Sequence, residues 1–235
     1  MTMRLAVVGL GRMGSAVAAL AAERGWEVVA RIGSHENGEG QGITVESLRR
    51  ADVALELTTP RAAPANAIAC VRAGCPVVVG TTGWDEKRAD VEREVRRLNG
   101  AMLVAPNFSL GVHIFWRVAE VAAELAGRVR EAQTYIVETH HTGKRDAPSG
   151  TARELQRRVE AAAQRPVPVT SVRAGHVPGT HELIIDAPFE QIRIIHEARD
   201  RRVFAAGALD AAAWLAGRSG VFTMSDVLDS QGDGR

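Results

Sequence analysis

A glycine-rich turn between an apolar run and a helix-forming run places the strongest constraint on the fold of this chain. Residues 4–8 are Arg-Leu-Ala-Val-Val, residues 9–14 are Gly-Leu-Gly-Arg-Met-Gly, and residues 15–23 are rich in alanine. A Gly-x-Gly-x-x-Gly turn that ends a strand and opens a helix is typical of a unit that holds a dinucleotide. Its glycines allow a tight turn, a close approach to a pyrophosphate and close packing of the helix. We therefore predict a Rossmann-type start to the chain.

The first hundred residues continue this alternation of strands and helices. We predict strands at residues 4–8, 26–31, 51–58, 76–79 and 101–105, and helices at residues 15–23, 62–73 and 85–98. The alternation indicates an α/β fold with a doubly wound parallel sheet, whose ligand-binding loops lie at the carboxyl ends of the strands. The residues expected to contact the dinucleotide at these ends are Gly9, Leu10, Gly11, Arg12, Met13, Gly14, Arg31, Thr58, Gly80, Thr81, Thr82, Ala105, Asn107 and Phe108.

The end of the second strand bears on which nicotinamide cofactor is used. An acidic residue at this position would accept hydrogen bonds from the ribose hydroxyls of NAD, but this chain has Arg31, followed by Ser34 and His35. An arginine with nearby hydroxyl and imidazole donors suits a 2′-phosphate, and Arg12 adds a second cation. We therefore predict a preference for NADPH. NADH stays an alternative if Arg31 is only a solvated strand end.

The side chains best suited to chemistry gather in residues 138–151, which read Glu-Thr-His-His-Thr-Gly-Lys-Arg-Asp-Ala-Pro-Ser-Gly-Thr. Good helix formers follow, and a helix that starts there directs unpaired N–H groups at whatever precedes it. That helix start and Lys144 can hold an anion while an imidazole moves a proton, which suits a small carboxylated substrate. His140 and His141 follow a predicted strand, so they should face different ways. In the alternative interpretation, these are ordinary surface residues.

Beyond residue 108, strands follow one another without intervening helices. We predict helices at residues 112–128 and from residue 148, strands at 133–139, 171–173, 182–185 and 191–198, and an apolar helix at 204–216 that packs on the first domain. This pattern indicates an α+β domain on an open sheet, whose uncovered face is a candidate oligomer surface. The predicted domains are residues 1–107 with 204–235 for the dinucleotide, and residues 108–203 for substrate binding and oligomerisation.

Charge and cysteine content exclude other classes of protein. The 235 residues carry 29 basic and 28 acidic side chains, so the net charge of +1 lacks the basic excess of a nucleic-acid-binding protein. Cys70 and Cys75 do not have the spacing of metal ligands and fit a reducing compartment. Without a signal peptide or an apolar run of about 18 residues, we expect a cytoplasmic protein that does not span a membrane.

Together these motifs resemble those of the 4-hydroxy-tetrahydrodipicolinate reductase family, long called dihydrodipicolinate reductase. The resemblance spans nearly the whole chain, and the run at residues 138–152 is its most specific part. The other matching segments are residues 11–14, 79–83, 105–111, 177–180 and 204–208, and His196 with Arg201. The resemblance implies a Rossmann domain joined to a second α+β domain built on an open mixed sheet, and a homotetramer assembled through those sheets.

The resemblance also implies an activity and the residues that perform it. The activity is the NAD(P)H-dependent reduction of a cyclic unsaturated dicarboxylate to tetrahydrodipicolinate in diaminopimelate and lysine biosynthesis, and it needs no metal. His140 would be the proton donor and Lys144 the other catalytic cation. The residues that would bind the substrate carboxylates are His141, Ser149, Gly150 and Thr151.

Three alternatives to this interpretation stay open. The chain could be another NAD(P)-dependent reductase or amino-acid dehydrogenase, a non-catalytic dinucleotide sensor, or a protein that binds a metal through His140, His141 and Asp146. The proton donor beside Lys144 argues against the sensor, which has no use for one. Two departures from the family pattern also stand out: the glycine turn is tighter than the usual Gly-x-x-Gly-x-x-Gly, and residues 56–58 replace a commoner Asp-Phe pair.

Overall fold

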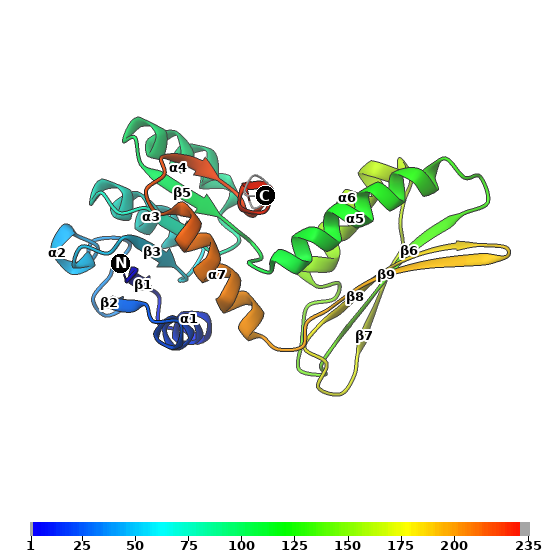
Figure 1. The fold of residues 1–235 in the computed structure, drawn as a ribbon, viewed down its shortest axis with the longest axis horizontal. Helices are drawn as coiled ribbons and strands as arrows, with labels where there is room; N and C mark the ends of the chain where they lie inside the picture. The colour runs from blue at the N-terminus through cyan, green and yellow to red at the C-terminus, as the bar shows by residue number, and fades with distance from the viewer. Residues whose placement is uncertain (1, 231–235) are drawn as a thin grey trace. The chain divides into compact units, whose positions relative to one another are not determined.

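The computed structural model describes residues 2–230, and the chain divides into two compact units. Unit 1 comprises Met1–Ser109 and Arg202–Arg235, and unit 2 comprises Leu110–Arg201 (Figure 1). Each boundary lies two residues from the position that the sequence indicates. The chain therefore leaves unit 1 once and returns to it once.

Unit 1 is built on a six-stranded parallel sheet in the order β10-β5-β4-β3-β1-β2. Its strands are β1 Arg4–Val8, β2 Glu27–Ile32, β3 Val53–Glu56, β4 Val77–Val79, β5 Ala101–Val104 and β10 Gly220–Phe222. From β1 the chain moves to β2 on one side and then to β3, β4 and β5 on the other, which confirms the predicted doubly wound sheet. The central strands are continuous buried runs because helices cover both of their faces.

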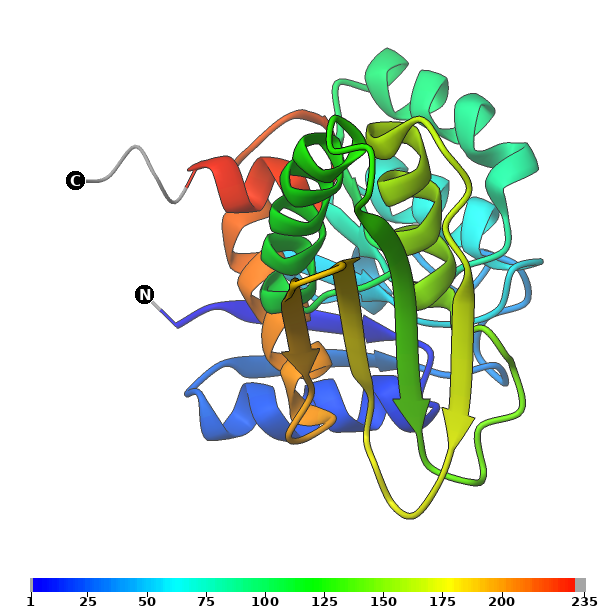
Figure 2. The same ribbon diagram turned by 90° about the vertical axis from the view of Figure 1, so that its right-hand side faces the viewer.

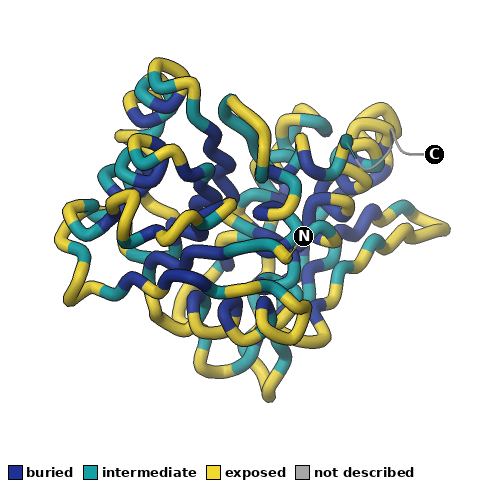
Figure 3. Tube along the Cα trace, turned by 60° about the vertical axis from the view of Figure 1, so that its left-hand side comes forward, coloured by how far each residue is buried: buried dark blue, intermediate teal, exposed yellow. Residues whose placement is uncertain are grey.

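The helices of unit 1 form two layers. They are α1 Arg12–Glu23, α2 Val45–Leu48, α3 Ala63–Arg72, α4 Asp85–Arg97, α7 Arg202–Leu215 and α8 Met224–Ser230. Helices α3 and α4 pack against each other, whereas α7 packs against α1 and against β3, β4 and β5. The strands consist mainly of buried residues, whereas the helices carry exposed residues on the side that faces away from the sheet (Figure 3). The sequence does not predict α2, α8 and β10, because these elements are too short to show a periodic pattern.

Unit 2 is a four-stranded mixed sheet with two helices on one face. The strands are β6 Gln133–His140, β7 Val169–Arg173, β8 Thr180–Ala187 and β9 Glu190–Glu197, in the order β7-β6-β8-β9. Strand β7 is parallel to β6, and β8 and β9 continue the sheet as antiparallel strands, which confirms the predicted mixed sheet. Helices α5 Leu110–Gly127 and α6 Gly150–Ala163 lie together behind the strands in Figure 2. Within residues 2–230, no helix is long and apolar enough to cross a lipid bilayer.

The core of unit 2 explains why α5 and α6 cover this face. Ile136 and Leu183 point from neighbouring strands into a cluster with Trp116, Leu155 and Val159 of the two helices, and all five side chains are buried. Every second residue of β6 from Thr134 onward is buried, as expected for a strand with one covered face. This alternation carries polar residues onto the covered face at the carboxyl end of β6.

The glycine turn of unit 1 yields a stability prediction. A Cβ atom at Gly14 would lie 1.9 Å from the Gly9 carbonyl oxygen, whereas a Cβ atom at Gly11 would meet no atom within 4 Å. Gly14→Ala should therefore lower the free energy of unfolding by at least about 2 kcal/mol, since the backbone of α1 must move away from β1. Gly11→Ala should cost less than about 1 kcal/mol. Urea denaturation of the two variants checks this, and equal losses would contradict it.

Candidate active site

The carboxyl ends of neighbouring strands form one edge of the unit 1 sheet. Strands β1, β3, β4 and β5 are adjacent and parallel, so their final residues and the loops after them lie side by side. This edge gathers the glycine turn and three further predicted segments. The predicted cofactor residues at this edge are Gly9, Leu10, Gly11, Arg12, Met13, Gly14, Thr58, Gly80, Thr81, Thr82, Ala105, Asn107 and Phe108.

The geometry of the glycine turn fits a dinucleotide. Gly9 has a φ of +97°, and its N–H donates to the Ile32 carbonyl oxygen at 2.9 Å, which fixes the turn beside the end of β2. A Cβ atom at Gly9 would lie 2.3 Å from the Leu57 carbonyl oxygen, so only glycine fits there. Gly11 is the exposed N-cap of α1, with open space in front of it. A pyrophosphate could approach the first N–H groups of the helix through this space.

A buried glutamic acid lies beneath this edge, and sequence analysis gave it no role. Glu56 is fully buried, and its Oε1 accepts hydrogen bonds from the Thr58 hydroxyl and from Asn66 Nδ2, the latter at 3.0 Å. The Thr58 N–H donates to Thr81 Oγ1 at 2.8 Å. Burial raises the pKa of Glu56, and hydrogen bonds from Thr58, Thr81 and Asn66 oppose that rise. The network fixes Thr58 and Thr81, two of the predicted cofactor residues.

Hydrogen bonds of Asn37 hold the polar, glycine-rich loop at residues 33–42 together. The Asn37 Oδ1 atom accepts hydrogen bonds from Gly40 N at 2.9 Å and from Gly42 N at 3.2 Å. The Asn37 amide also donates to Asn66 Oδ1 at 2.8 Å, which joins the loop to the network around Glu56. The two asparagines thus connect the loop after β2 to α3 and, through the bond from Asn66 Nδ2 to Thr58 Oγ1 at 3.1 Å, to the loop after β3.

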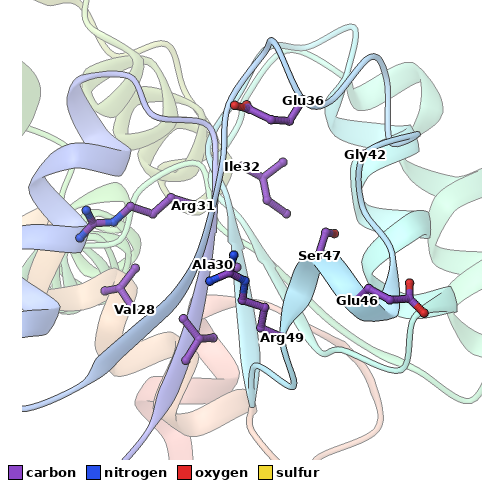
Figure 4. A pocket seen from close by; sticks show the side chains of 10 residues that line it. Val28, Ala30, Arg31, Ile32, Glu36, Gly42, Glu46, Ser47 and Arg49 are labelled. Atoms are coloured by element: carbon purple, nitrogen blue, oxygen red, sulfur yellow. The ribbon is translucent and has the colours of Figure 1, made fainter.

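Arg31 lies at the outer edge of the sheet, next to a surface hollow of about 730 Å³ between β2 and α2. Figure 4 shows its side chain on the opposite side of β2 from Ile32 and Ser47. Arg31 is the only predicted cofactor residue that lines the hollow, and Glu36 and Glu46 line it too. Arg49 lines it as well, so two arginines are balanced by two glutamates and the hollow is not a phosphate site by itself. Dinucleotide binding is therefore assigned from the glycine turn, and Arg31 bears only on the choice between NADPH and NADH.

In unit 2 the centre of the candidate site is a histidine–carboxylate pair at the end of β6. Glu138 and His140 share the covered face of the strand, where Glu138 is fully buried and His140 is 7% exposed. The Nδ1 atom of His140 is hydrogen-bonded to Glu138 Oε2. The other carboxylate oxygen accepts from Arg173 Nη2 at 2.6 Å and from the Ser149 N–H at 3.4 Å. The carboxylate therefore joins β6, β7 and the start of α6.

The charges of this pair affect each other. Burial opposes ionisation of Glu138, but hydrogen bonds from Arg173 and Ser171 and the charge of His140 outweigh it and lower the pKa to about 2. Burial also lowers the pKa of His140, while the charge of Glu138 opposes that shift. His140 is therefore mainly neutral at pH 7 in the absence of ligand, and it is a stronger acid than a solvated imidazole once protonated.

A glycine faces the other nitrogen of His140. A Cβ atom at Gly179 would lie 2.9 Å from His140 Nε2, and Gly179 has a φ of +157°. Its carbonyl oxygen accepts from the Ala198 N–H at 2.9 Å, so β8 and β9 hold this backbone in place. This contact explains why a glycine stands in the segment Val-Pro-Gly-Thr at residues 177–180. Any side chain at Gly179 would cover His140 Nε2.

The second histidine and the lysine have partners of their own. The Nε2 atom of His141 lies 2.6 Å from Arg201 Nη2, so it accepts from the guanidinium. Lys144 Nζ lies 2.8 Å from Asp146 Oδ1, and this hydrogen bond lowers the pKa of Asp146. Among the described residues, His141 and Asp146 do not join His140 in a group of potential metal ligands, which argues against a metal held by these three residues. Arg201 is a further cation that sequence analysis left without a role.

Ser149 is used inside the protein rather than displayed at its surface. It is the N-cap of α6 and is 2% exposed; its Oγ accepts from the Ala152 N–H at 3.1 Å and is bonded to His181 Nε2 at 3.1 Å. Gly150 is exposed and Thr151 is half-buried. The helix start therefore presents its first turn through Gly150 and Thr151, while Ser149 fixes that turn to the sheet.

Within residues 2–230, one group of three side chains has its potential metal ligands close together. Ligand atoms of Glu138, His140 and His181 lie within 4.8 Å of one another. The Glu138 carboxylate already bonds to the guanidinium of Arg173, whose charge opposes a second cation. The arrangement favours proton handling over metal binding.

Comparisons with known proteins identify the family of this chain. The model of the dihydrodipicolinate reductase N-terminus matches residues 3–108, and the model of the dihydrodipicolinate reductase C-terminus matches residues 111–228. The 4-hydroxy-tetrahydrodipicolinate reductase of Christiangramia forsetii is 34% identical over 96% of this chain and 98% of its own length. That of Archaeoglobus fulgidus is 36% identical over 97% of this chain and 100% of its own length.

Solved structures support the fold. A dipicolinate-bound dihydrodipicolinate reductase from Paenisporosarcina sp. TG-14 has a TM-score of 0.77 and 21% identity, and the match covers 95% of this chain and 98% of that one. Aspartate dehydrogenase from Thermotoga maritima has a TM-score of 0.52 and 10% identity over 93% of this chain and 98% of that one, so the likeness to it is one of fold. With both halves of the chain matched by the family models, this protein belongs to the dihydrodipicolinate reductase family.

Proposed function

We propose that this chain reduces 4-hydroxy-tetrahydrodipicolinate to tetrahydrodipicolinate, with His140 as the proton donor and Lys144 as the second catalytic cation. Family membership supports the reaction, which belongs to diaminopimelate and lysine biosynthesis. The main support for the proposed site is the buried pair of His140 and Glu138, which lies beside the start of α6. A dicarboxylate substrate requires a proton donor next to an anion-binding element, and this pair and the helix start suit those two roles.

The substrate carboxylates are held by the helix start and by cations of unit 2. The first N–H groups of α6, at Gly150 and Thr151, bind one carboxylate, and Lys144 adds a positive charge. Lys144 exchanges Asp146 for the substrate, because a partly exposed ion pair is weak and gives way to a stronger anion. His141, held by Arg201, donates from its other nitrogen, and Ser149 keeps the helix start in place.

His140 supplies the proton from the nitrogen that faces away from Glu138. Because Nδ1 is held by the carboxylate, the proton for transfer is carried on Nε2, next to Gly179. The two negative charges of a bound substrate raise the pKa of His140, so substrate binding favours its protonated form. The 4-hydroxyl group leaves as water, which gives the unsaturated ring that accepts a hydride, and NAD(P)H would supply that hydride when bound. The imidazolium of His140 then protonates the carbanion-like centre that hydride addition leaves on the ring.

The cofactor residues are those at the carboxyl edge of the unit 1 sheet, together with Arg31. We propose NADPH over NADH because Arg31 is exposed at the end of β2, directly beside the glycine turn, and no acidic residue takes its place. Arg12, exposed at the start of α1, adds a second cation for the phosphates.

We also propose that the protein forms a homotetramer through the open face of the unit 2 sheet. Val172 of β7 and Ile195 of β9 point to the face opposite α5 and α6, and they are 38% and 54% exposed. Apolar side chains on an otherwise uncovered sheet favour burial against another copy. The other expected partner is the small dicarboxylate substrate.

A coupled assay tests the proposed activity. A synthase acting on pyruvate and aspartate semialdehyde generates the ring substrate in place, and NADPH oxidation is followed by absorbance, then repeated with NADH. We expect oxidation that depends on the synthase, a larger kcat/KM with NADPH, and no reaction with aspartate or linear diaminopimelate. If the protein binds NADPH but oxidises neither cofactor in this assay, the result would favour another acid substrate or a non-catalytic dinucleotide sensor. A larger kcat/KM with NADH would refute the role of Arg31.

Replacement of the two proposed catalytic residues should separate chemistry from cofactor binding. His140→Ala and Lys144→Ala should each lower kcat by about 100-fold or more, since each removes a group that acts on the ring, while the Kd for NADPH stays unchanged. His176→Ala and Lys87→Ala are matched controls, because both side chains are exposed and neither belongs to the proposed site. Unchanged kcat in both test variants would remove the proposed mechanism.

The charge of Glu138 should set the pH range of activity. Glu138 raises the pKa of His140 against the effect of burial, so Glu138→Gln should lower that pKa further. The fall of kcat/KM on the alkaline side should then begin at a lower pH in the variant than in the wild-type enzyme. Glu94→Gln is the control, because arginines also hold the pKa of Glu94 at about 2 but it has no contact with His140. An unmoved profile in Glu138→Gln would mean that Glu138 does not act on His140.

A further inference from the structure

A row of polar residues crosses the covered face of the unit 2 sheet. In the strand register, Glu138 of β6 pairs with His181 of β8, and His181 pairs with His196 of β9. Residues directly opposite each other on neighbouring strands share a face, so the three side chains lie in one line. His181, in the middle of this row, is 5% exposed, and its ring stands edge-on to His140 with centroids 5.2 Å apart. It takes no part in the mechanism derived above.

His181 makes its side-chain hydrogen bond at the start of α6. Its Nε2 atom lies 3.1 Å from the Oγ of Ser149, the N-cap residue, while its Nδ1 atom is buried without a partner. A buried N–H group without an acceptor costs more than a buried lone pair without a donor, so we assign the proton to Nε2. His181 therefore donates to Ser149 Oγ, which also accepts from the Ala152 N–H.

His181 also stays uncharged. Its pKa is lowered to about 3, mainly by burial and also by the charges of His140 and His196. A neutral ring at this position adds no positive charge beside His140, and its hydrogen bond to Ser149 stays the same across the pH range in which His140 titrates. The contact is thus suited to holding a fixed geometry while the neighbouring histidine gains and loses its proton.

Two separate contacts therefore fix the residue from which α6 starts. Glu138 accepts from the Ser149 N–H, and His181 donates to the Ser149 hydroxyl. Both contacts come from residues of the sheet that adjoin His140. The distance between the first turn of α6 and the imidazole of His140 depends on both.

We propose that His181 is a positioning residue for substrate binding, which holds Ser149 so that the first N–H groups of α6 face a substrate carboxylate at a fixed place relative to His140. This inference rests on the proposed function, since it assumes that the helix start binds a carboxylate of the ring. It assigns His181 an effect on the binding of dicarboxylates and none on the binding of the cofactor.

The test measures the binding of dipicolinate, a stable planar dicarboxylate, by calorimetry and as a competitive inhibitor. His181→Leu removes the donor and should weaken dipicolinate binding and raise KM for the ring substrate about tenfold, as expected for one lost hydrogen bond that orients a binding group. The KM for NADPH should stay unchanged. His181→Gln, whose amide can donate to Ser149, should recover binding to within about threefold of the wild type.

Two further variants separate positioning from a general loss of packing. His196→Leu is the matched control, because it removes a histidine from the same row that has no bond to Ser149, and it should leave dipicolinate binding unchanged. In the Ser149→Ala background, His181→Leu should cause less than about a twofold further loss, because His181 acts through the Ser149 hydroxyl. Thermal melting of each variant establishes that it is folded.

Four outcomes would overturn the proposal: unchanged dipicolinate binding in His181→Leu, equal losses in His181→Leu and His181→Gln, an equal loss in His196→Leu, or no binding of dipicolinate by the wild-type protein. The failure of the proposed function has a different signature. Wild-type protein that binds dipicolinate and NADPH but shows no synthase-dependent turnover would contradict the reductase activity, while the binding data would still decide the role of His181.

Discussion

The buried carboxylate of Glu138 fixes the geometry of the candidate active site. An ionised group without contact with water is stable only if charges and hydrogen-bond donors compensate it, and Arg173, His140 and the Ser149 N–H do so here. Each donor belongs to a different segment, so compensation of one charge also orients the imidazole, ties β7 to β6 and anchors the start of α6. In the proposed mechanism, substrate binding and proton transfer thus depend on the same carboxylate.

Unit 1 contains a second buried carboxyl group, and its surroundings are different. Glu56 has hydrogen bonds from Thr58 and Asn66 but no basic side chain among its partners, so burial raises its pKa, whereas the pKa of Glu138 falls to about 2. Glu56 organises the cofactor edge through hydrogen bonds from neutral side chains, and Glu138 organises the candidate substrate site through bonds from charged ones. The two units therefore shift the pKa of the same side-chain type in opposite directions.

The sequence predicts the local parts of this arrangement well and the distant parts poorly. The doubly wound sheet and the helix start near Ser149 follow from short-range patterns, namely apolar periodicity, glycine spacing and the residues around a helix start. Arg173 and His181 meet Glu138 only because β7 and β8 pair with β6 in one register, and no local pattern shows that register in advance. The bonds of Ser149 to His181 and of His141 to Arg201 are of the same kind, since they join residues that are far apart in the sequence.

The tautomer of His140 is the most direct test of the role of Glu138. Long-range proton–nitrogen correlation spectra of protein labelled with ¹⁵N-histidine, assigned with the help of a His140→Gln variant, report which ring nitrogen carries the proton. If the Glu138 carboxylate accepts from His140, the neutral ring carries its proton on Nδ1 and leaves Nε2 unprotonated at pH values above its pKa. A proton on Nε2 in the neutral ring would mean that Glu138 is not an ionised acceptor, and would contradict the account of the site.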